Sequence, residues 1–186
     1  AFLFGGKKRG GTWPQAAEAM AEVAVIFEQQ LDTYTTHEAG VLVRPSKDQS
    51  AAQLKAEIER AMTATDRTKI RYGVETDDTS HAWLVLRENA LADLAGAVAA
   101  VGEAFESGGV IGRVVAVVYP FTWSHRRVYW IYQPRIQAFT PFAPAEGNRD
   151  KERDHPLEVR MESAIRRKLP TSRDITNWYP IWGMPV

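Results

Sequence analysis

The sequence predicts a single α+β domain in which helices flank a mainly antiparallel sheet. Its 186 residues, 45% of them hydrophobic and 25% charged, suit one globular domain that buries roughly 70% of its unfolded surface. Apolar residues recur at helical spacing in several segments, with short β-branched runs between them. Neighbouring runs favour hairpins over regular strand–helix alternation. The predicted order is α-β-α-β-β-α-β-β-(β)-α, followed by an aromatic C-terminal tail.

Residues 1–11 are predicted to form a flexible N-terminal arm, and residues 12–186 the domain with its self-docked tail. The arm contains four glycines, but its Gly-Lys content lacks the spacing of a phosphate-binding loop. Its alternative role is a contact with an anionic membrane, because apolar rings beside cations add affinity for such a surface. The residues of this contact would be Phe2, Phe4, Lys7, Lys8 and Arg9.

Capping boxes predict the start of the first two helices, because their paired side chains satisfy free backbone N–H groups. Thr12 with Gln15 begins the first helix, and Ser50 with Gln53 begins the second. Apolar residues then recur at helical intervals and define the buried faces: Ala16, Met20, Val23, Phe27 and Leu31 in the first helix, Leu54, Ile58, Ala61 and Met62 in the second.

Three strands are predicted in the same half of the chain. Ala39–Arg44 forms a short strand between the two helices, and Pro45 ends it. Thr68–Glu75 and Ala82–Glu88 follow, joined by a polar stretch of turn-forming residues. We expect these two segments to form a hairpin.

The third helix has the most regular pattern in the chain. Asn89 is the predicted N-cap, and Gly108-Gly109 is the predicted stop. Between them, apolar residues alternate in steps of three and four: Leu91, Leu94, Val98, Val101 and Phe105.

The remaining elements are two paired strands, an edge strand and a last helix. Val114–Val118 is continuously apolar, which is typical of a central strand with little solvent contact on either face. Val128–Tyr132 is expected to pair near it, and Ile136–Phe139 forms an edge strand after Pro134. The last helix presents an apolar stripe of Leu157, Met161, Ile165 and Leu169.

Composition excludes several classes of function. Basic and acidic residues balance at 23 each, so no general affinity for nucleic acid is expected. The absence of cysteine excludes thiol catalysis and zinc–thiolate sites and fits a reducing compartment. No apolar stretch reaches the roughly 18–20 residues of a membrane span, and no signal peptide is recognised.

No catalytic site, metal site or cofactor is predicted. The histidines at 37, 81, 125 and 155 have no metal-binding spacing. Ser124-His125 lacks the elbow motif of a nucleophilic serine, and Asp77-Asp78 reads as an ordinary solvated turn. The sequence therefore favours a non-enzymatic protein.

Aromatic residues outside the predicted strands are the best candidates for function. The tail, Trp178–Val186, contains three rings that present roughly 450–750 Å² of largely apolar surface. That surface should dock on the chain's own core or on a partner, because an exposed patch of this kind is adhesive. The candidate partner-binding residues are Trp123, Phe139, Pro141, Phe142, Pro144, Trp178, Tyr179 and Trp182. With the tail docked on the domain, Phe139–Pro144 and nearby loops become the favoured partner surface.

Three motifs in the second half resemble those of a known family. They are Val128–Tyr132, Phe139–Pro144 and the terminal Trp178–Pro185. Together with a Phe-Leu-Phe-Gly-Gly-Lys start, they resemble the PspA-associated PspAB family over the whole chain. The element order is also similar to that of secretion-chaperone-like α+β domains, which is an analogy of fold alone.

The resemblance implies a cytoplasmic accessory protein of phage-shock membrane-stress systems. An alternative form of this prediction places the protein peripherally at the inner face of the cell membrane. Its expected partner is a PspA-like coiled-coil protein, and an HtpX-type membrane protease is a further one. The alternative from the residues themselves is a small-ligand-binding protein or enzyme with an apolar pocket beneath the tail.

Overall fold

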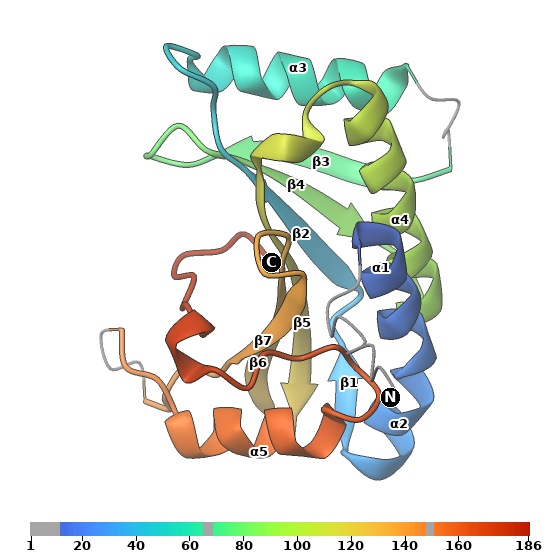
Figure 1. Ribbon diagram of the computed structural model, residues 1–186, viewed down its shortest axis with the longest axis vertical. Helices are drawn as coiled ribbons and strands as arrows, with labels where there is room; N and C mark the ends of the chain where they lie inside the picture. Colours follow the sequence, from blue (N-terminus) through green and yellow to red (C-terminus); the bar gives the residue numbers. More distant parts are fainter. Residues whose placement is uncertain (1–11, 65–68, 148–150) are drawn as a thin grey trace, which may run out of the picture.

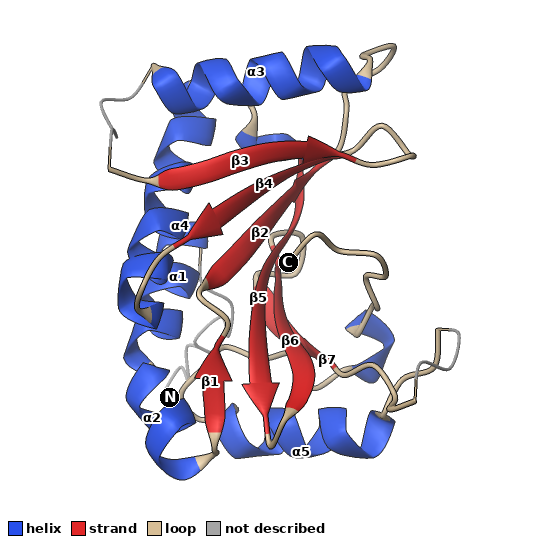
Figure 2. Ribbon diagram, turned by 180° about the vertical axis from the view of Figure 1, so that it is seen from behind, coloured by secondary structure: helices blue, strands red, loops and turns tan. Residues whose placement is uncertain are grey.

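The computed structural model describes residues 12–64, 69–147 and 151–186 as an α+β domain with a seven-stranded antiparallel sheet (Figures 1 and 2). The predicted fold class is confirmed. In chain order the elements are α1 (Trp13–Glu22), α2 (Ala24–Gln30), β1 (Thr33–Thr35), β2 (Glu38–Val43), α3 (Ala51–Thr63), β3 (Arg71–Thr76), β4 (Ala82–Arg87), α4 (Leu91–Ser107), the 3-10 turn η1 (Ile111–Arg113), β5 (Val114–Trp123), β6 (Arg126–Gln133), β7 (Ala138–Phe142), α5 (His155–Ile165) and the 3-10 turn η2 (Ile175–Asn177).

The sheet runs β3-β4-β2-β5-β6-β7, and every pairing between these strands is antiparallel. Along the same edge, the long strand β5 pairs with two different strands. Its first half pairs with β2, and its last three residues pair with β1. The edge of β7 is covered rather than open, because the Phe139 N–H donates to the Pro170 carbonyl and the Ser172 N–H donates to the Phe139 carbonyl.

Alternation along the strands gives the sheet two apolar faces. The first face packs against the helices, with α1 and α4 side by side in both views (Figures 1 and 2). Phe27 of α2 meets Phe121 of β5 edge to face there, with ring centroids 4.9 Å apart. The second face is smaller and carries Leu42, Trp83, Val85, Ala116, Val118, Ile131 and Phe142. It has no helix of its own among the described residues and is covered by the C-terminal residues.

Local signals placed most helix starts correctly. At the predicted box before α3, the Ser50 N–H donates to Gln53 Oε1 over 2.8 Å, and the Gln53 N–H donates to Ser50 Oγ over 3.2 Å. The predicted cap at Asn89 is wrong, because Ala90 occupies that position. The Asn89 side chain instead accepts a hydrogen bond from Arg71 of β3.

Several elements differ from the prediction. The first helix is two helices, α1 and α2, that meet at Val23, where β-branched residues crowd the preceding turn. The short strand β1 was not predicted. The last strand runs from 138 to 142 rather than 136 to 139, because the Ile136 N–H donates to the Gln133 carbonyl in a turn and Gln137 has a φ of 51°.

The hairpin between β5 and β6 is tighter than predicted. Both strands extend to a two-residue turn at Ser124 and His125, whose φ angles are 45° and 68°. Two positive φ angles match the twist of the flanking strands, as in type I′ hairpins. His125 therefore has a structural place in a surface turn.

Candidate interaction site

The C-terminal segment, residues 178–186, lies on the second face of the sheet. Trp178 is buried, and Trp182 meets Phe142 edge to face with centroids 4.9 Å apart. Val186 is also buried and lies over Gly40 of β2, where an added Cβ would come within 3.3 Å of it. Ile181 and Met184 pack half-buried on the same face. The segment therefore serves as the second cover of the sheet.

Polar contacts hold the start of this segment. Trp178 Nε1 donates to the Ser172 carbonyl over 2.9 Å, and the Trp178 carbonyl accepts from Arg153 Nη1 over 2.6 Å. One residue earlier, the Asn177 carbonyl accepts from Gln133 Nε2 of β6 over 2.7 Å. Hydrogen bonds from a charged donor are stronger than neutral ones, so the contact with Arg153 contributes most among these three to holding the segment.

Arg153 is itself fixed by a buried carboxylate. Its Nε lies 2.9 Å from Glu158 Oε1 on α5, and Glu158 has no exposed surface. The same Oε1 accepts from the Ala143 N–H over 3.0 Å, and Glu158 Oε2 lies 3.0 Å from His155 Nδ1. The buried charge is thus paired and hydrogen-bonded through Oε1, whereas Oε2 accepts no hydrogen bond from the described residues. Glu158 thus joins α5 to the residues after β7 and, through Arg153, to the C-terminal segment.

The N-terminus of α5 is capped by a second ion pair. Asp154 Oδ1 accepts from the Leu157 N–H over 2.9 Å, and Arg126 Nη1 of β6 lies 2.6 Å from Asp154 Oδ2. The hydrogen bond from Arg126, followed by the capping N–H, lowers the pKa of Asp154 below its usual range. These contacts place α5 against the β6–β7 end of the sheet, where Figure 1 shows it at the opposite end of the molecule from α3.

An open groove of about 730 Å³ remains between the C-terminal segment and the sheet. Its floor is aliphatic and is built from Leu42, Ile111, Val114, Val115, Ala116 and Ile131. Pro134 and the residues Tyr179, Pro180 and Ile181 form its walls. Volumes of roughly 300–1,000 Å³ are usual for ligand sites, and an aliphatic floor is usual as well.

Two arginines give the groove its charge. Arg44 follows β2, Arg135 lies in the turn between β6 and β7, and both are exposed. Neither side chain forms an ion pair or hydrogen bond with the described residues. The residues that line the groove include no aspartate or glutamate. The groove is therefore apolar at its floor and positive at its rim.

One comparison with known proteins identifies the family. The family model described as PspA associated protein B, PspAB, matches residues 2–186. The chain belongs to the PspAB family. No curated protein and no solved structure matches it. The resemblance seen in the terminal motifs is thus confirmed over the whole chain.

Most of the aromatic candidates of this PspAB-family chain are enclosed by the domain. Phe139, Pro141, Phe142 and Trp178 are buried, so their side chains pack the core instead of presenting the partner surface expected at 139–144. The remaining candidates, Trp123, Pro144 and Trp182, are half-buried.

Tyr179 is the exposed member of the predicted set, with 54% of its surface accessible, and it lines the groove. The candidates in the N-terminal arm, Phe2, Phe4, Lys7, Lys8 and Arg9, lie outside the described residues.

The groove cannot be recognised in the sequence, because its residues come from four distant stretches of the chain. Val115 illustrates the difficulty. It belongs to the run 114–118, which predicts a strand buried on both faces, yet it is 40% exposed. Among the described residues, no helix or C-terminal residue buries Val115, and the sequence gives no local sign of this. That Arg44 and Arg135 have no ion-pair partner in the described part of the chain also becomes visible only with the fold.

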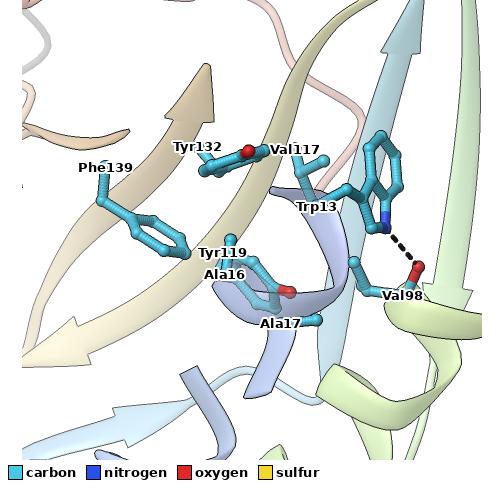
Figure 3. A pocket seen from close by; sticks show the side chains of 8 residues that line it. All are labelled: Trp13, Ala16, Ala17, Val98, Val117, Tyr119, Tyr132 and Phe139. Atoms are coloured by element: carbon cyan, nitrogen blue, oxygen red, sulfur yellow. Dashed lines mark hydrogen bonds between the residues drawn. The ribbon is translucent and has the colours of Figure 1, made fainter. Parts of the chain in front are cut away.

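A second hollow lies under α1, between Trp13 and two tyrosines of the sheet (Figure 3). Trp13 Nε1 donates to the Val98 carbonyl over 2.8 Å, and the hollow has no room for a water molecule. Burial raises the pKa of Tyr132 to about 12 and raises that of Tyr119 further. These phenols therefore stay neutral at physiological pH and act as packing groups.

The described part of the chain contains no group of three or more histidine, aspartate or glutamate side chains that could hold a metal ion. None of its helices is both long and apolar enough to cross a bilayer.

Proposed function

We propose that this PspAB-family chain is a non-enzymatic accessory protein that binds a PspA-type coiled-coil protein through the groove beside its C-terminal segment. The open, positively rimmed groove is the observation that carries the proposal. The family description, which names an association with PspA, supports the choice of partner. The setting is a phage-shock response to membrane stress at the cytoplasmic side of the membrane.

The chemistry of the groove favours binding over catalysis. The described residues that line it include no histidine, serine, threonine or carboxylate that could act as a base or nucleophile. The Gln133 side chain in the lining is already engaged, because its Nε2 donates to Thr140 Oγ1 over 2.9 Å and to the Asn177 carbonyl over 2.7 Å. The tyrosine and the two arginines at its edge are residue types that are enriched in protein-binding hot spots.

A matched pair of valines tests the proposal. Val115, 40% exposed, lies in the groove, and Val159, 49% exposed, lies on α5 outside it. Binding of the purified chain to a purified PspA-type protein is measured by titration calorimetry. We expect Val115→Asp to weaken binding at least tenfold, or about 1.4 kcal/mol, because a carboxylate would be buried against the floor. Val159→Asp should leave the affinity unchanged.

Thermal melting of both variants checks that each still folds. Equal affinities for the two folded variants would remove the groove from the proposal. A parent chain that does not bind the PspA-type protein at all would refute the proposal itself.

A second candidate function is small-ligand binding in the same groove. The volume of about 730 Å³ favours it, because this lies within the usual range for ligand sites. A ligand at 100 times its Kd would raise the free energy of unfolding by about 2.7 kcal/mol, which a thermal-shift screen of metabolites detects. Stabilisation that is lost in Val115→Asp would favour this candidate over the adaptor.

Two further contacts belong to the proposal. One is with an HtpX-type membrane protease and rests on the family resemblance alone. The other is peripheral binding to anionic membranes through residues 2–9, which rests on the rings and cations of that stretch and is tested by flotation with vesicles after its deletion.

A further inference from the structure

We infer that the groove takes an amphipathic helix of the partner whose polar flank is acidic, with its apolar side chains on the aliphatic floor and its carboxylates on Arg44 and Arg135. This inference rests on the proposed function, since it names the chemistry of the segment that the groove binds. It follows from the charge, the pairing and the hydrogen bonding of the described residues around the groove.

The first step is the state of the two arginines. Arg113, which precedes the groove strand β5, is satisfied: its Nη2 lies 2.6 Å from Glu57 Oε1, and its Nη1 donates to Gln49 Oε1 over 3.0 Å. Arg44 and Arg135 have no such partners among the described residues. A guanidinium offers five donors in a planar fork that suits a carboxylate. Two guanidinium groups at one apolar groove, without ion-pair partners among the described residues, therefore favour an occupant that carries negative charge.

The second step concerns how the charge of the occupant is arranged. Arg44 and Arg135 come from different elements, one after β2 and the other in the β6–β7 turn, and both are exposed. Gln133, a buried amide of the lining, donates its Nε2 hydrogens to Thr140 and Asn177. Recognition of charge is thus confined to the exposed rim. That pattern suits carboxylates spread along the flank of a peptide better than one head group on a buried acyl chain.

The third step is the form of the segment. A PspA-like coiled coil presents helices whose apolar stripes alternate with charged positions. A helix laid in a groove contacts it with side chains three, four and seven residues apart, so one ridge can be apolar while its neighbours are charged. The aliphatic floor between Val115 and Ile131 accepts such a ridge. Tyr179, at the wall, supplies an aromatic contact.

Charge reversal at the rim tests the inference. The probe is the purified PspA-type protein, and its affinity is measured at about 50 mM and about 500 mM salt. We expect Arg44→Glu with Arg135→Glu to weaken binding at least tenfold at low salt, and the difference to shrink at high salt, because exposed ion pairs are screened. Arg167→Glu with Arg173→Glu, two exposed arginines outside the groove lining, supplies the control matched in charge.

The outcomes separate this inference from the proposed function. If Val115→Asp weakens binding but the double reversal acts no more than its matched control, the acidic helix is overturned while the groove remains the docking site. Failure of the parent chain to bind overturns both. Vesicles of phosphatidylglycerol form the last arm: loss of vesicle binding in the double reversal, with binding to the PspA-type protein intact, would assign the groove to lipid and overturn the inference.

Discussion

Replacing Gly102 with alanine tests the contact that joins the two long helices of the first face. Gly102 lies in α4 directly under the ring of Trp13, and an added Cβ would lie 2.5 Å from both Cδ1 and Nε1 of that ring. Normal contacts between such atoms are about 3.5–4.0 Å, so the ring must move by about 1 Å. The ring is rigid and buried, and its Nε1 donates to the Val98 carbonyl, so the movement also loses that hydrogen bond.

The expected cost follows from three contributions. Overpacking a filled site costs about 1–3 kcal/mol, and the lost hydrogen bond costs about 1 kcal/mol. The higher helix propensity of alanine compared with glycine stabilises the folded protein by about 1 kcal/mol and offsets part of this cost. Gly102→Ala should therefore lower the free energy of unfolding by about 1–3 kcal/mol. For a domain of this size that corresponds to a fall in Tm of about 2–12 °C.

The same helix supplies the control. Gly96 is exposed, and an added Cβ there meets nothing within 4 Å, so Gly96→Ala should raise the free energy of unfolding by about 1 kcal/mol. Melting and denaturant titration of both variants give the comparison. In a Trp13→Ala background the clash is absent, and Gly102→Ala should then behave like Gly96→Ala. A Gly102→Ala protein as stable as Gly96→Ala in the parent background would refute the reasoning.

Two further predictions concern the cover of the second face and the cap of α5. Gly40→Ala should lower the free energy of unfolding by about 1–2 kcal/mol, because its Cβ would meet the Trp83 ring at 3.0 Å. The control is Gly73→Ala, whose Cβ would meet nothing within 4 Å and which should be neutral or stabilising by up to about 1 kcal/mol. Equal losses of melting temperature in the two variants would contradict this prediction. Asp154→Asn keeps the capping oxygen but loses the charge that Arg126 stabilises, so it should cost about 1 kcal/mol at pH 7. Because the folded-state pKa of Asp154 is lowered, this stability is present above the ordinary value of about 3.9 and is lost as the pH falls through the lowered value. Denaturant titrations that show the same difference in acid as at pH 7 would contradict the assignment.

The elements that the sequence predicts correctly are those whose signals are local. The box at Ser50 and Gln53 needs only four residues of chain, and the apolar steps of α4 need only one helix face. The signal for β1 is too short to stand alone, because three residues pair only with the far end of β5. The cap of α4 fails for a related reason. The pairing of β3 with β4 brings Arg71 within hydrogen-bonding distance of Asn89, and this contact cannot be inferred from the residues next to Asn89 in the sequence.

The candidate site divides in the same way. Trp178 and Phe142 are recognisable as unusual residues, and their burial follows once the tail docks. The groove depends on which part of the sheet stays uncovered, so Val115 changes from an expected core residue to an exposed one. Arg44 is inconspicuous in the sequence, because what distinguishes it is that no carboxylate of the described residues pairs with it in space.

The late position of the residues that cover the second face has a consequence for synthesis of the protein. Trp83 and Val186, which meet over Gly40, are separated by about 100 residues of chain. At roughly 5–20 residues per second, a ribosome needs about 5–20 s to make that stretch. During this interval the strands β2 and β4 are complete while their second face has no cover. The nascent chain is therefore most exposed to aggregation, and most open to capture by chaperones, after β2 and β4 have been made and before residues 178–186 emerge.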